Sequence, residues 1–472
     1  MKNIIHIALL IIIALIAGCS NSYIQEVHRG DNYDFRPGYP ELRTFSASYF
    51  DTLGASKVLI SGELVKGSLI YKRNSEGFYA SADIEISLNS KGDTTNIIPT
   101  EIFTIYVEDS SPQIILSQEV TKFERSIALK PGEYDVIVTA TDRQSLRETT
   151  SKTKLYIPDP NAVESYLTDI RMEVKPRSDE QGDYSYVNTY DIPNRFDSLK
   201  FTFQVYNPET TDEMIINSRL LEFESDTSVA IPMSYRNHQK SSLPYIGVAY
   251  YKPKIIESSR RVITDNGNIS VVFKFPSLKR GNYRFEVTTS TSDKNQLVKA
   301  RDFSIKSINY PSLKSARELL MPMQYIMREK EFKQFESLST EDSLKTAIDK
   351  YWLSHIKSRT KARQVLELYY TRVEEANKQF SNFKEGWKTD PGMVYILFGP
   401  PLYVDYEFDK MTWIYIFDTA NRQPAITFDL VRNNDNNYPF NHYVLQRNQS
   451  LSQLEYAQIS AWNDGSILSI NK

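Results

Sequence analysis

Apolar and polar residues alternate along the amino-terminal half of the chain, and this pattern predicts β-strands. In the segment 80–88 every second residue is apolar, and the residues between are Ser, Asp, Glu and Ser. A period of two is typical of a half-buried antiparallel strand. Further short runs follow at 102–107, 134–140 and 154–157, with turn residues between them. Short strands at this spacing predict a β-sandwich, which we place at residues 47–158.

A second strand-rich block follows the Pro-Asp-Pro-Asn break at 158–161 and occupies residues 163–307. The two blocks share an internal repeat, because the segment 129–139 aligns with the segment 278–288. In each copy a Gly is followed two residues later by a Tyr that enters a strand. This arrangement resembles the tyrosine corner of immunoglobulin-like sandwiches. The repeat therefore predicts two tandem immunoglobulin-like β-sandwiches.

The hydrophobic period then changes to that of α-helices. Helical spacing runs through 312–338, 341–358 and 360–383, as expected for amphipathic helices with one apolar face. Pro322 is expected to kink or split the first of them, because proline removes a helical hydrogen bond. We therefore predict a helical segment at residues 311–385.

The remaining residues, 386–472, predict a small sheet packed on helices, an α+β unit. The Asp-Pro-Gly turn at 390–392 is expected to lead into a strand at 394–398. The run Gly399-Pro400-Pro401 would end that strand, because neither proline can donate to a ladder. The predicted fold class is thus multidomain and mainly β: two tandem sandwiches, a helical segment and a carboxy-terminal α+β domain.

The amino terminus has the features of a bacterial export signal. The residues 4–17 are apolar except for His6, a run too short for a membrane span but suited to a signal-peptide core. The run ends in Ile16-Ala17-Gly18-Cys19, which resembles the lipobox of bacterial lipoproteins. The resemblance implies a signal peptide at 1–18, lipidation of Cys19 and a tether at 19–46.

The residues after Cys19 bear on localisation. Ser20 rather than Asp follows the cysteine, and in the familiar Gram-negative sorting pattern this implies an anchor in the outer membrane. The stretch 20–23 lacks the acidic run that directs lipoproteins of some lineages to the cell surface. We therefore expect a periplasm-facing protein, with surface exposure as the alternative.

The amino-acid composition bears on which classes of molecule the protein binds. The 472 residues contain 56 Lys and Arg against 59 Asp and Glu, a formal net charge of −3. This balance lacks the electrostatic footprint of a nucleic-acid-binding protein. Cys19 is the only cysteine of the chain, so an exported form cannot make an intramolecular disulfide and must depend on its packed cores.

The predicted third helix runs directly into Gly386-Trp387-Lys388-Thr389-Asp390. This sequence resembles the motif of the GWxTD domain, a family of bacterial proteins that are mostly exported or lipidated. The flanks at 370–377 and 395–401 are similar to those of the family, whereas Pro391 stands where the family often has Arg. The family has no established reaction, so the resemblance implies a GWxTD domain at 386–472 but no activity.

Each motif residue has a structural interpretation beside a functional one. In the structural interpretation Gly386 ends a helix, Trp387 is an anchor, and Thr389 and Asp390 accept backbone N–H groups at a helix-to-strand joint. In the functional interpretation the motif shapes a recognition surface. The candidate interaction residues are Gly386, Trp387, Thr389, Asp390, Gly399, Pro400 and Pro401.

No motif for chemistry is present in the sequence. The histidines outside the signal peptide stand singly, without a His-x-x-x-His pair or a cysteine partner, so we expect no metal and no cofactor. Neither a Gly-x-Ser-x-Gly elbow nor a Walker loop occurs. We name no catalytic residue, and a hydrolase that uses His442 with Asp390 or Asp429 stays open because acid and base can meet only in the fold.

These observations lead to one functional hypothesis and its alternatives. We expect an outer-membrane lipoprotein without enzymatic activity that scaffolds or assembles an envelope protein complex, such as one for secretion or surface motility. Its partners would be envelope proteins, and its membrane contact would be the lipid. The alternatives are an enzyme that acts on glycan or peptidoglycan and a glycan-binding lipoprotein.

Overall fold

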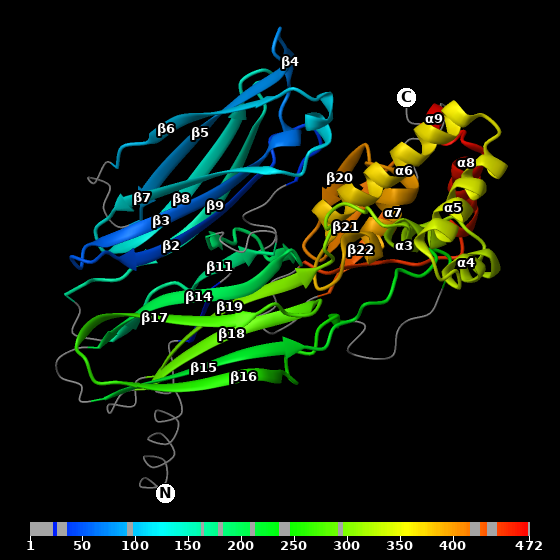
Figure 1. Ribbon diagram of the computed structural model, residues 1–472. Coiled ribbons are helices and arrows are strands. Elements are labelled where there is room, and N and C mark those ends of the chain that lie inside the picture. Colours follow the sequence, from blue (N-terminus) through cyan, green and yellow to red (C-terminus); the bar gives the residue numbers. More distant parts are fainter. Residues whose placement is uncertain are drawn as a thin grey trace, which may run out of the picture.

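The computed structural model describes residues 22–25, 35–91, 98–161, 165–177, 183–207, 213–235, 246–290, 296–415, 425–431 and 441–470. Over these residues the chain is mainly β, with five sheets and a helical region in the carboxy-terminal part. Figure 1 shows two strand-rich blocks that lie against each other and a mixed helical block beside them. The predicted signal peptide and Cys19 lie outside the described residues. Among the residues that are described, no helix is long and apolar enough to cross a membrane.

The first block is a β-sandwich, as the alternation predicts. Its core contains Ile60, Ile84 and Val136, each at most 1% exposed. One sheet consists of β2 (Leu42–Phe50), β3 (Ser56–Val65) and β7 (Val120–Ala128). The other consists of β4 (Lys72–Arg73), β5 (Phe78–Ser90), β6 (Glu101–Asp109), β8 (Gly132–Asp142) and β9 (Glu148–Ile157).

Strand β2 begins at Leu42, inside the segment 19–46 that we predicted as a tether. It pairs with β3 along its whole length, and most of its residues are buried whichever way they point. A strand covered on both faces lacks the alternation that identifies a half-exposed strand, which explains the misplaced boundary. A short strand, β1 (Ser22–Gln25), also falls in this segment and pairs in parallel with β19 of the second block.

The second block is also a sandwich, with an aromatic core. Phe201 from one sheet stacks on Phe285 from the other with ring centroids 4.4 Å apart, and both rings are fully buried. One sheet holds β13 (Asp191–Pro193), β15 (Met214–Phe223), β16 (Lys254–Ile263), β18 (Gly281–Ser290) and β19 (Gln296–Lys306), together with β1. The other holds β10 (Tyr166–Leu167), β11 (Arg171–Pro176), β12 (Ser185–Tyr186), β14 (Phe196–Asn207) and β17 (Gly267–Pro276).

The internal repeat is confirmed at the level of single hydrogen bonds. The Tyr134 hydroxyl at the start of β8 donates to the Lys130 carbonyl oxygen at 2.9 Å. The Tyr283 hydroxyl at the start of β18 donates to the Lys279 carbonyl oxygen, also at 2.9 Å. Both rings are 2% exposed. Each tyrosine therefore fixes the turn that precedes its strand, in the manner of a tyrosine corner.

Buried polar contacts join the two sandwiches. The Asp169 carboxylate accepts from the Ser48 backbone and hydroxyl at 2.8 and 2.9 Å and pairs with Lys299 at 2.9 Å. The Gln204 side chain bonds both backbone groups of Phe50, at 2.7 and 2.8 Å. Because these contacts are directional and largely shielded from water, they set the orientation of one sandwich on the other.

The helical region begins as the periodicity predicts. Pro322 splits the first helical stretch into α3 (Ala316–Leu320), the 3-10 turn η3 (Met321–Tyr325) and α4 (Glu329–Glu336). The next two predicted helices are α5 (Glu341–His355) and α6 (Arg359–Phe380). The last described helices are α8 (Leu451–Asp464) and α9 (Ile467–Ile470).

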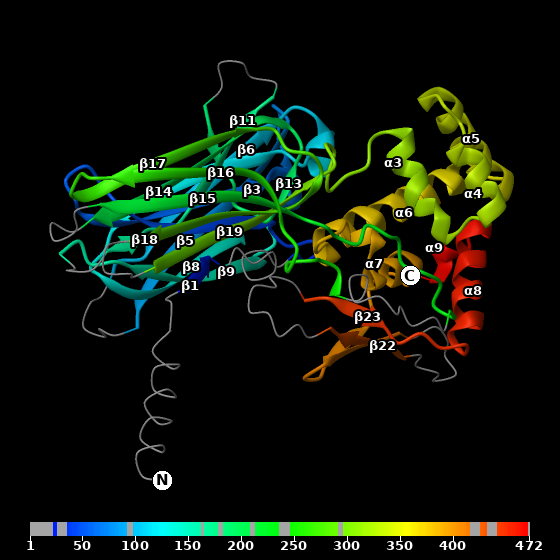
Figure 2. The same cartoon turned by 90° about the horizontal axis from the view of Figure 1, so that it is seen from below.

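The predicted strand at 394–398 is wrong, because these residues belong to the helix α7 (Asp390–Phe398). This helix is buried along almost its whole length, so its apolar residues show no amphipathic period. The predicted sheet lies farther along and consists of β20 (Tyr403–Tyr406), β21 (Lys410–Ile414), β22 (Ala425–Leu430) and β23 (Tyr443–Leu445). Figure 2 shows β22 and β23 on one side of α7 and α6 on the other.

The tyrosine corners give a stability prediction. Tyr134→Phe and Tyr283→Phe each remove one hydrogen bond to a turn carbonyl, and each should lower the free energy of unfolding by about 1 kcal/mol. Urea denaturation of each variant measures the loss. Tyr156→Phe, at a ring that is 58% exposed, is the control and should change nothing. Equal stability of all three variants would contradict the role of the corner hydroxyls.

Candidate functional site

The GWxTD motif lies in the loop between α6 and α7 and in the first turn of α7. Gly386 opens the 3-10 turn η4 (Gly386–Lys388) and passes close to the backbone of α6. A Cβ atom at Gly386 would lie 1.9 Å from the Ala376 carbonyl oxygen, and the Gly386 N–H donates to the Ser381 hydroxyl at 2.6 Å. The position therefore admits only glycine, because a side chain would push the loop away from α6.

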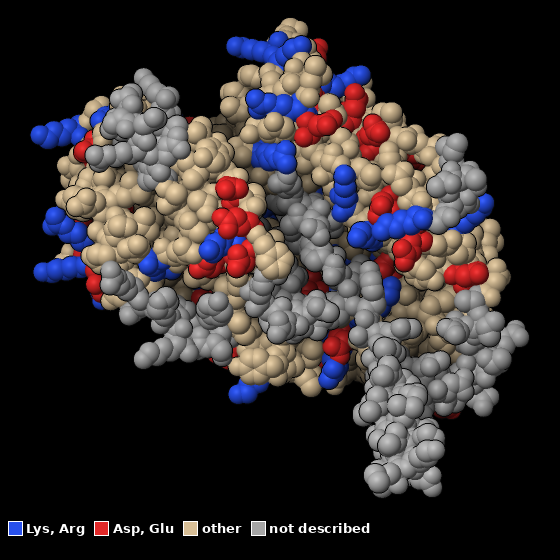
Figure 3. Space-filling view, turned by 180° about the vertical axis from the view of Figure 1, so that it is seen from behind, with Lys and Arg blue, Asp and Glu red and all other residues tan. Residues whose placement is uncertain are grey.

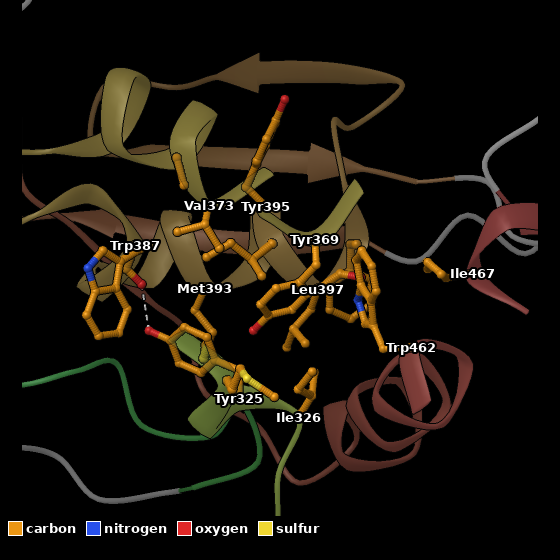
Figure 4. Close-up of a cluster of buried hydrophobic side chains, with 14 of the residues drawn as sticks. Tyr325, Ile326, Tyr369, Val373, Trp387, Met393, Tyr395, Leu397, Trp462 and Ile467 are labelled. Atoms are coloured by element: carbon orange, nitrogen blue, oxygen red, sulfur yellow. Dashed lines mark hydrogen bonds between the residues drawn. The ribbon is translucent and has the colours of Figure 1, made fainter. Parts of the chain in front are cut away.

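Trp387 is part of the hydrophobic core. Its ring is 3% exposed and meets Tyr325 edge-on with centroids 6.3 Å apart. The Tyr325 hydroxyl donates to the Trp387 carbonyl oxygen at 2.7 Å, as Figure 4 shows. The indole N–H donates to Glu385 at 3.2 Å. The side chain thus packs η3 against the motif loop and has its polar atom satisfied.

Thr389 is the N-cap of α7. Its hydroxyl accepts from the Gly392 N–H at 3.1 Å and donates to the Gly386 carbonyl oxygen at 2.7 Å. A Cβ atom at Gly392 would lie 1.8 Å from that same carbonyl oxygen. The threonine thus starts the helix and also ties the first turn of α7 back to the glycine that opens the motif.

Asp390 connects three segments that lie far apart in the sequence. Its carboxylate accepts from Arg447 in a bidentate pair, with N–O distances of 2.8 and 2.5 Å, and from the Leu445 N–H at 2.8 Å. The same guanidinium donates to the backbone oxygens of Ile231 and Pro232 at 3.1 and 3.3 Å. The pair therefore links α7, the end of β23 and the connection between β15 and β16, whose Met233 belongs to the same core as α7.

The other end of α7 is closed by Gly399 and Arg372. Gly399 adopts a φ of +83°, and a Cβ atom there would lie 2.5 Å from the Arg372 guanidinium. Arg372 is 3% exposed and donates to the Ile396 and Leu397 carbonyl oxygens at 3.2 and 3.4 Å. Burial lowers the pKa of Arg372 to about 10. A cation at a helix carboxy terminus complements the helix dipole, so Arg372 stabilises the end of α7.

Pro400 and Pro401 carry the chain from this end of α7 to β20. They follow a glycine that caps a helix, and they do not end a strand as predicted. The Tyr415 hydroxyl donates to the Gly399 carbonyl oxygen at 3.0 Å, which holds β21 next to the same turn. The whole predicted set of motif residues is therefore arranged at the two ends of one buried helix.

Charged residues of the second sandwich hold the motif loop. Glu385 pairs with Arg280 at 2.6 Å and with Lys388 at 3.4 Å. Burial alone would raise the pKa of Glu385, but Lys388, Arg280 and Lys306 together hold it below its ordinary value. Lys384 pairs with Asp226 at 2.9 Å. Sequence analysis did not find the pairs Glu385–Arg280 and Lys384–Asp226, because each joins positions more than a hundred residues apart.

Two backbone contacts complete this junction. The Asn282 side chain in β18 donates to the Phe383 carbonyl oxygen at 2.8 Å, and the Lys306 ammonium in β19 donates to the Asn382 carbonyl oxygen at 2.8 Å. All four residues are at most 4% exposed. The motif loop is therefore bonded to two strands of the sandwich as well as to α6.

Each residue considered for a hydrolytic site makes contacts with other residues in the described part of the chain. The Nδ1 atom of His442 lies 3.4 Å from the Asn382 side-chain nitrogen, and its ring meets the Phe383 ring edge-on. Asp390 is bound by Arg447, and Asp429 accepts from Gln446 at 2.6 Å. Within the described ranges, no three or more His, Cys, Asp or Glu side chains form a group that could hold a metal ion.

Trp387 gives a test of the structural role of the motif. Trp387→Ala removes a buried indole and should destabilise the carboxy-terminal domain by roughly 3–5 kcal/mol, the usual cost of deleting a core tryptophan. Trp387→Phe keeps an aromatic ring but loses the bond to Glu385, and should cost less. Urea denaturation compares the three proteins. A normal unfolding transition for Trp387→Ala would place the indole in an interface instead of the core.

The solved structures similar to this chain are distant. Red sea bream transglutaminase is 9% identical with a TM-score of 0.18, over 56% of this chain and 31% of that one. The latent dimeric PorU of Porphyromonas gingivalis is 10% identical with a TM-score of 0.23, over 57% and 20%. Salmonella alpha-2-macroglobulin is 14% identical with a TM-score of 0.18, over 59% and 17%. The sequence matches no curated protein.

The family comparison agrees with the motif. The model of the GWxTD domain matches residues 281–464, from the first residue of β18 to the last residue of α8. The matched unit thus includes the two strands that hold the motif loop, and it starts well before the predicted boundary at residue 386. Residues 281–464 of the chain therefore form a GWxTD domain.

Proposed function

We propose that this protein is a lipoprotein without enzymatic activity, anchored through Cys19 in the outer membrane and facing the periplasm, that scaffolds an envelope protein complex. Its two sandwiches and its GWxTD domain would act as one body, because buried polar contacts join each unit to the next. Such a body holds a binding surface at a fixed distance from the membrane. Secretion and surface motility are the processes in which we place the complex.

The observation that carries this proposal is an exposed aromatic hairpin in the GWxTD domain. Strands β20 and β21 form it. Leu402, Tyr403, Tyr406 and Phe408 are 62%, 51%, 67% and 84% exposed. Large apolar side chains that gather on a surface typically mark an interaction site. In contrast, Trp387 and Thr389 are each 3% exposed. These motif residues therefore belong to the core of the domain and not to its exposed surface.

The tip of the hairpin carries more acidic than basic side chains, and Lys410 is the only cation between residues 402 and 414. Asp405, Glu407 and Asp409 are exposed and alternate with the aromatic residues. Carboxylates beside aromatic rings suit Lys and Arg side chains, which pair with the former and lie over the latter. We therefore expect a basic segment in the partner protein. On the opposite side from the view in Figure 1, acidic and basic residues are interspersed, as Figure 3 shows.

The same rings also favour a second candidate function, glycan binding. Aromatic faces stack on apolar faces of ligands, and neighbouring carboxylates can accept hydrogen bonds from hydroxyl groups. The two candidates differ in what the lipoprotein carries with it when it is isolated. A protein partner gives a defined stoichiometry, whereas a glycan ligand does not give a protein band.

The test is a crosslinked pull-down of the tagged protein from detergent-solubilised envelopes, read by mass spectrometry. We expect one stoichiometric envelope protein with the native chain and its loss with Cys19→Ser, because the unlipidated chain does not reach the same membrane. The double variant Tyr406→Ser/Phe408→Ser should lose the partner at least tenfold while its melting temperature stays unchanged.

Tyr456→Ser is the matched control, because this aromatic residue of α8 is 72% exposed and lies outside the hairpin. It should retain the partner. Recovery of the native lipoprotein alone would remove the scaffold proposal, and binding to isolated envelope glycans would then be measured with the same variants. If the hairpin variant recovers as much partner as the native chain, the binding surface lies elsewhere on the protein.

A further inference from the structure

Among the residues that the structure describes, the strand β16 forms an open edge of the second sandwich. It pairs with β15 on one side, and it stands at the end of its sheet in the strand order. Figure 1 shows it at the margin of the molecule. Eight of its ten residues are exposed, and among them Ile255, Ile256 and Val262 are 53%, 40% and 44% exposed. A long edge with aliphatic side chains is a template for strand pairing.

The edge strand β6 of the first sandwich exposes apolar residues as well, because Ile102 and Tyr106 are 66% and 70% exposed. Phe103 from β6 meets Phe123 from β7 with centroids 5.4 Å apart. The Arg125 guanidinium covers the Phe103 ring at 3.9 Å and pairs with Glu101 at 3.4 Å. At β16 the Arg261 guanidinium likewise lies 4.1 Å from the Phe273 ring and donates to the Val272 carbonyl oxygen at 3.1 Å. The aliphatic residues of β16 nevertheless stay exposed.

The sequence of β16 is complementary to itself. When two copies of the strand are placed antiparallel about a two-fold axis at Ser259, Glu257 of each copy faces Arg261 of the other. Ile256 and Val262, both exposed and apolar, then lie at the two ends of this ladder, with Ile256 of each copy near Val262 of the other. Opposite charges and apolar pairs at facing positions stabilise an antiparallel ladder. A two-fold axis makes each such pair occur twice.

Neighbouring registers lack this match. With the axis at Ser258, Ile255 faces Arg261 and Ile256 faces Arg260, which puts apolar side chains against cations. The pairing of β15 with β16 also shifts at Leu220, which adds one residue to β16 next to Glu257. Charges and bulges protect edge strands from random pairing. Here they leave one register in which the charges attract.

From this we propose that the protein forms a symmetric dimer, in which the β16 strands of two copies pair antiparallel about Ser259. The dimer joins the two sheets into one across the axis. This inference is independent of the proposed scaffold function, because β16 belongs to the second sandwich and the aromatic hairpin belongs to the sheet of β20–β23.

The first test is the mass of the purified chain in solution. The full chain carrying Cys19→Ser should sediment as a dimer at high concentration and dissociate on dilution. Ile256→Lys places a cation near Val262 and should shift the midpoint of this dissociation at least tenfold towards higher concentration. Lys152→Glu on β9, another exposed strand position, should leave it unchanged. A chain that sediments as a monomer at every concentration overturns the proposal.

The second test is specific to the register. Because Cys19 is the only cysteine, a single thiol can be introduced into the Cys19→Ser chain. Ser259→Cys should form a disulfide-linked dimer on mild oxidation, since facing residues of an antiparallel pair lie within reach of each other. Glu257→Cys and Arg261→Cys should each crosslink poorly alone but efficiently when mixed. Thr150→Cys, an exposed position on β9, is the control for random collision.

The crosslinking yields show whether the dimer forms in this register. Crosslinking of Ser259→Cys well above that of Thr150→Cys supports pairing about Ser259. Crosslinking at the level of the control overturns it, as does equal crosslinking of Glu257→Cys with itself and with Arg261→Cys. Because circular dichroism of each variant reports its fold, a variant that fails to fold is replaced by Arg260→Cys mixed with Ser258→Cys, the next facing pair.

Discussion

The ion pair between Asp390 and Arg447 is the contact on which the arrangement of the carboxy-terminal part depends. Both side chains are about nine-tenths buried, with 12% and 11% exposed. A buried charge is tolerated only when its partner and its remaining hydrogen-bonding atoms are in place. Here the carboxylate also accepts from the Leu445 N–H, and the guanidinium also donates to two backbone oxygens. Removing either residue would leave the other uncompensated, so the three segments must come together jointly.

The second constraint comes from the motif glycine, and it is steric. Gly386 lies against the carbonyl of Ala376, and this allows the motif loop to turn within the space between α6 and the second sandwich. The loop then bonds to β18 and β19 through Asn282 and Lys306. These strands fall inside the matched family domain. The family unit therefore consists of the motif together with the part of the sandwich that holds it.

Sequence patterns predicted the parts of this structure that depend on local repetition. The alternation at 80–88 correctly predicted the interior of β5. The Gly–Tyr repeat correctly predicted two tyrosine corners, in each of which the hydroxyl donates to the carbonyl oxygen four residues earlier. The pattern failed at α7, because a helix buried on every side has no polar face to reveal its period. The residues at its ends carried a better signal. Thr389 as N-cap, Pro391 in the first turn and Gly399 after the last turn are the start and stop residues of a helix.

The contacts that assemble the candidate site were beyond prediction for a different reason. Asp390 and Arg447 are separated by 57 positions, and Lys384 and Asp226 by 158. No period or motif in one sequence identifies which of 59 acidic side chains meets which of 56 basic ones. Only the fold decides these pairs. The outward-facing hairpin is a similar case, because an alternating strand predicts one buried face but not which strand remains at the edge.

In the GWxTD domain, the buried motif residues hold the fold together, and the exposed hairpin residues form the proposed binding surface. Gly386, Trp387, Thr389 and Asp390 make their contacts inside the protein, and each contact fixes the position of α7. The carboxy-terminal end of α7 then leads through Pro400 and Pro401 into β20, where the exposed aromatic residues begin. A change in the motif would therefore reach a partner only by moving the hairpin. Changes at the exposed hairpin residues Tyr406 and Phe408 would alter the bound surface with little effect on the fold, because these side chains are 67% and 84% exposed.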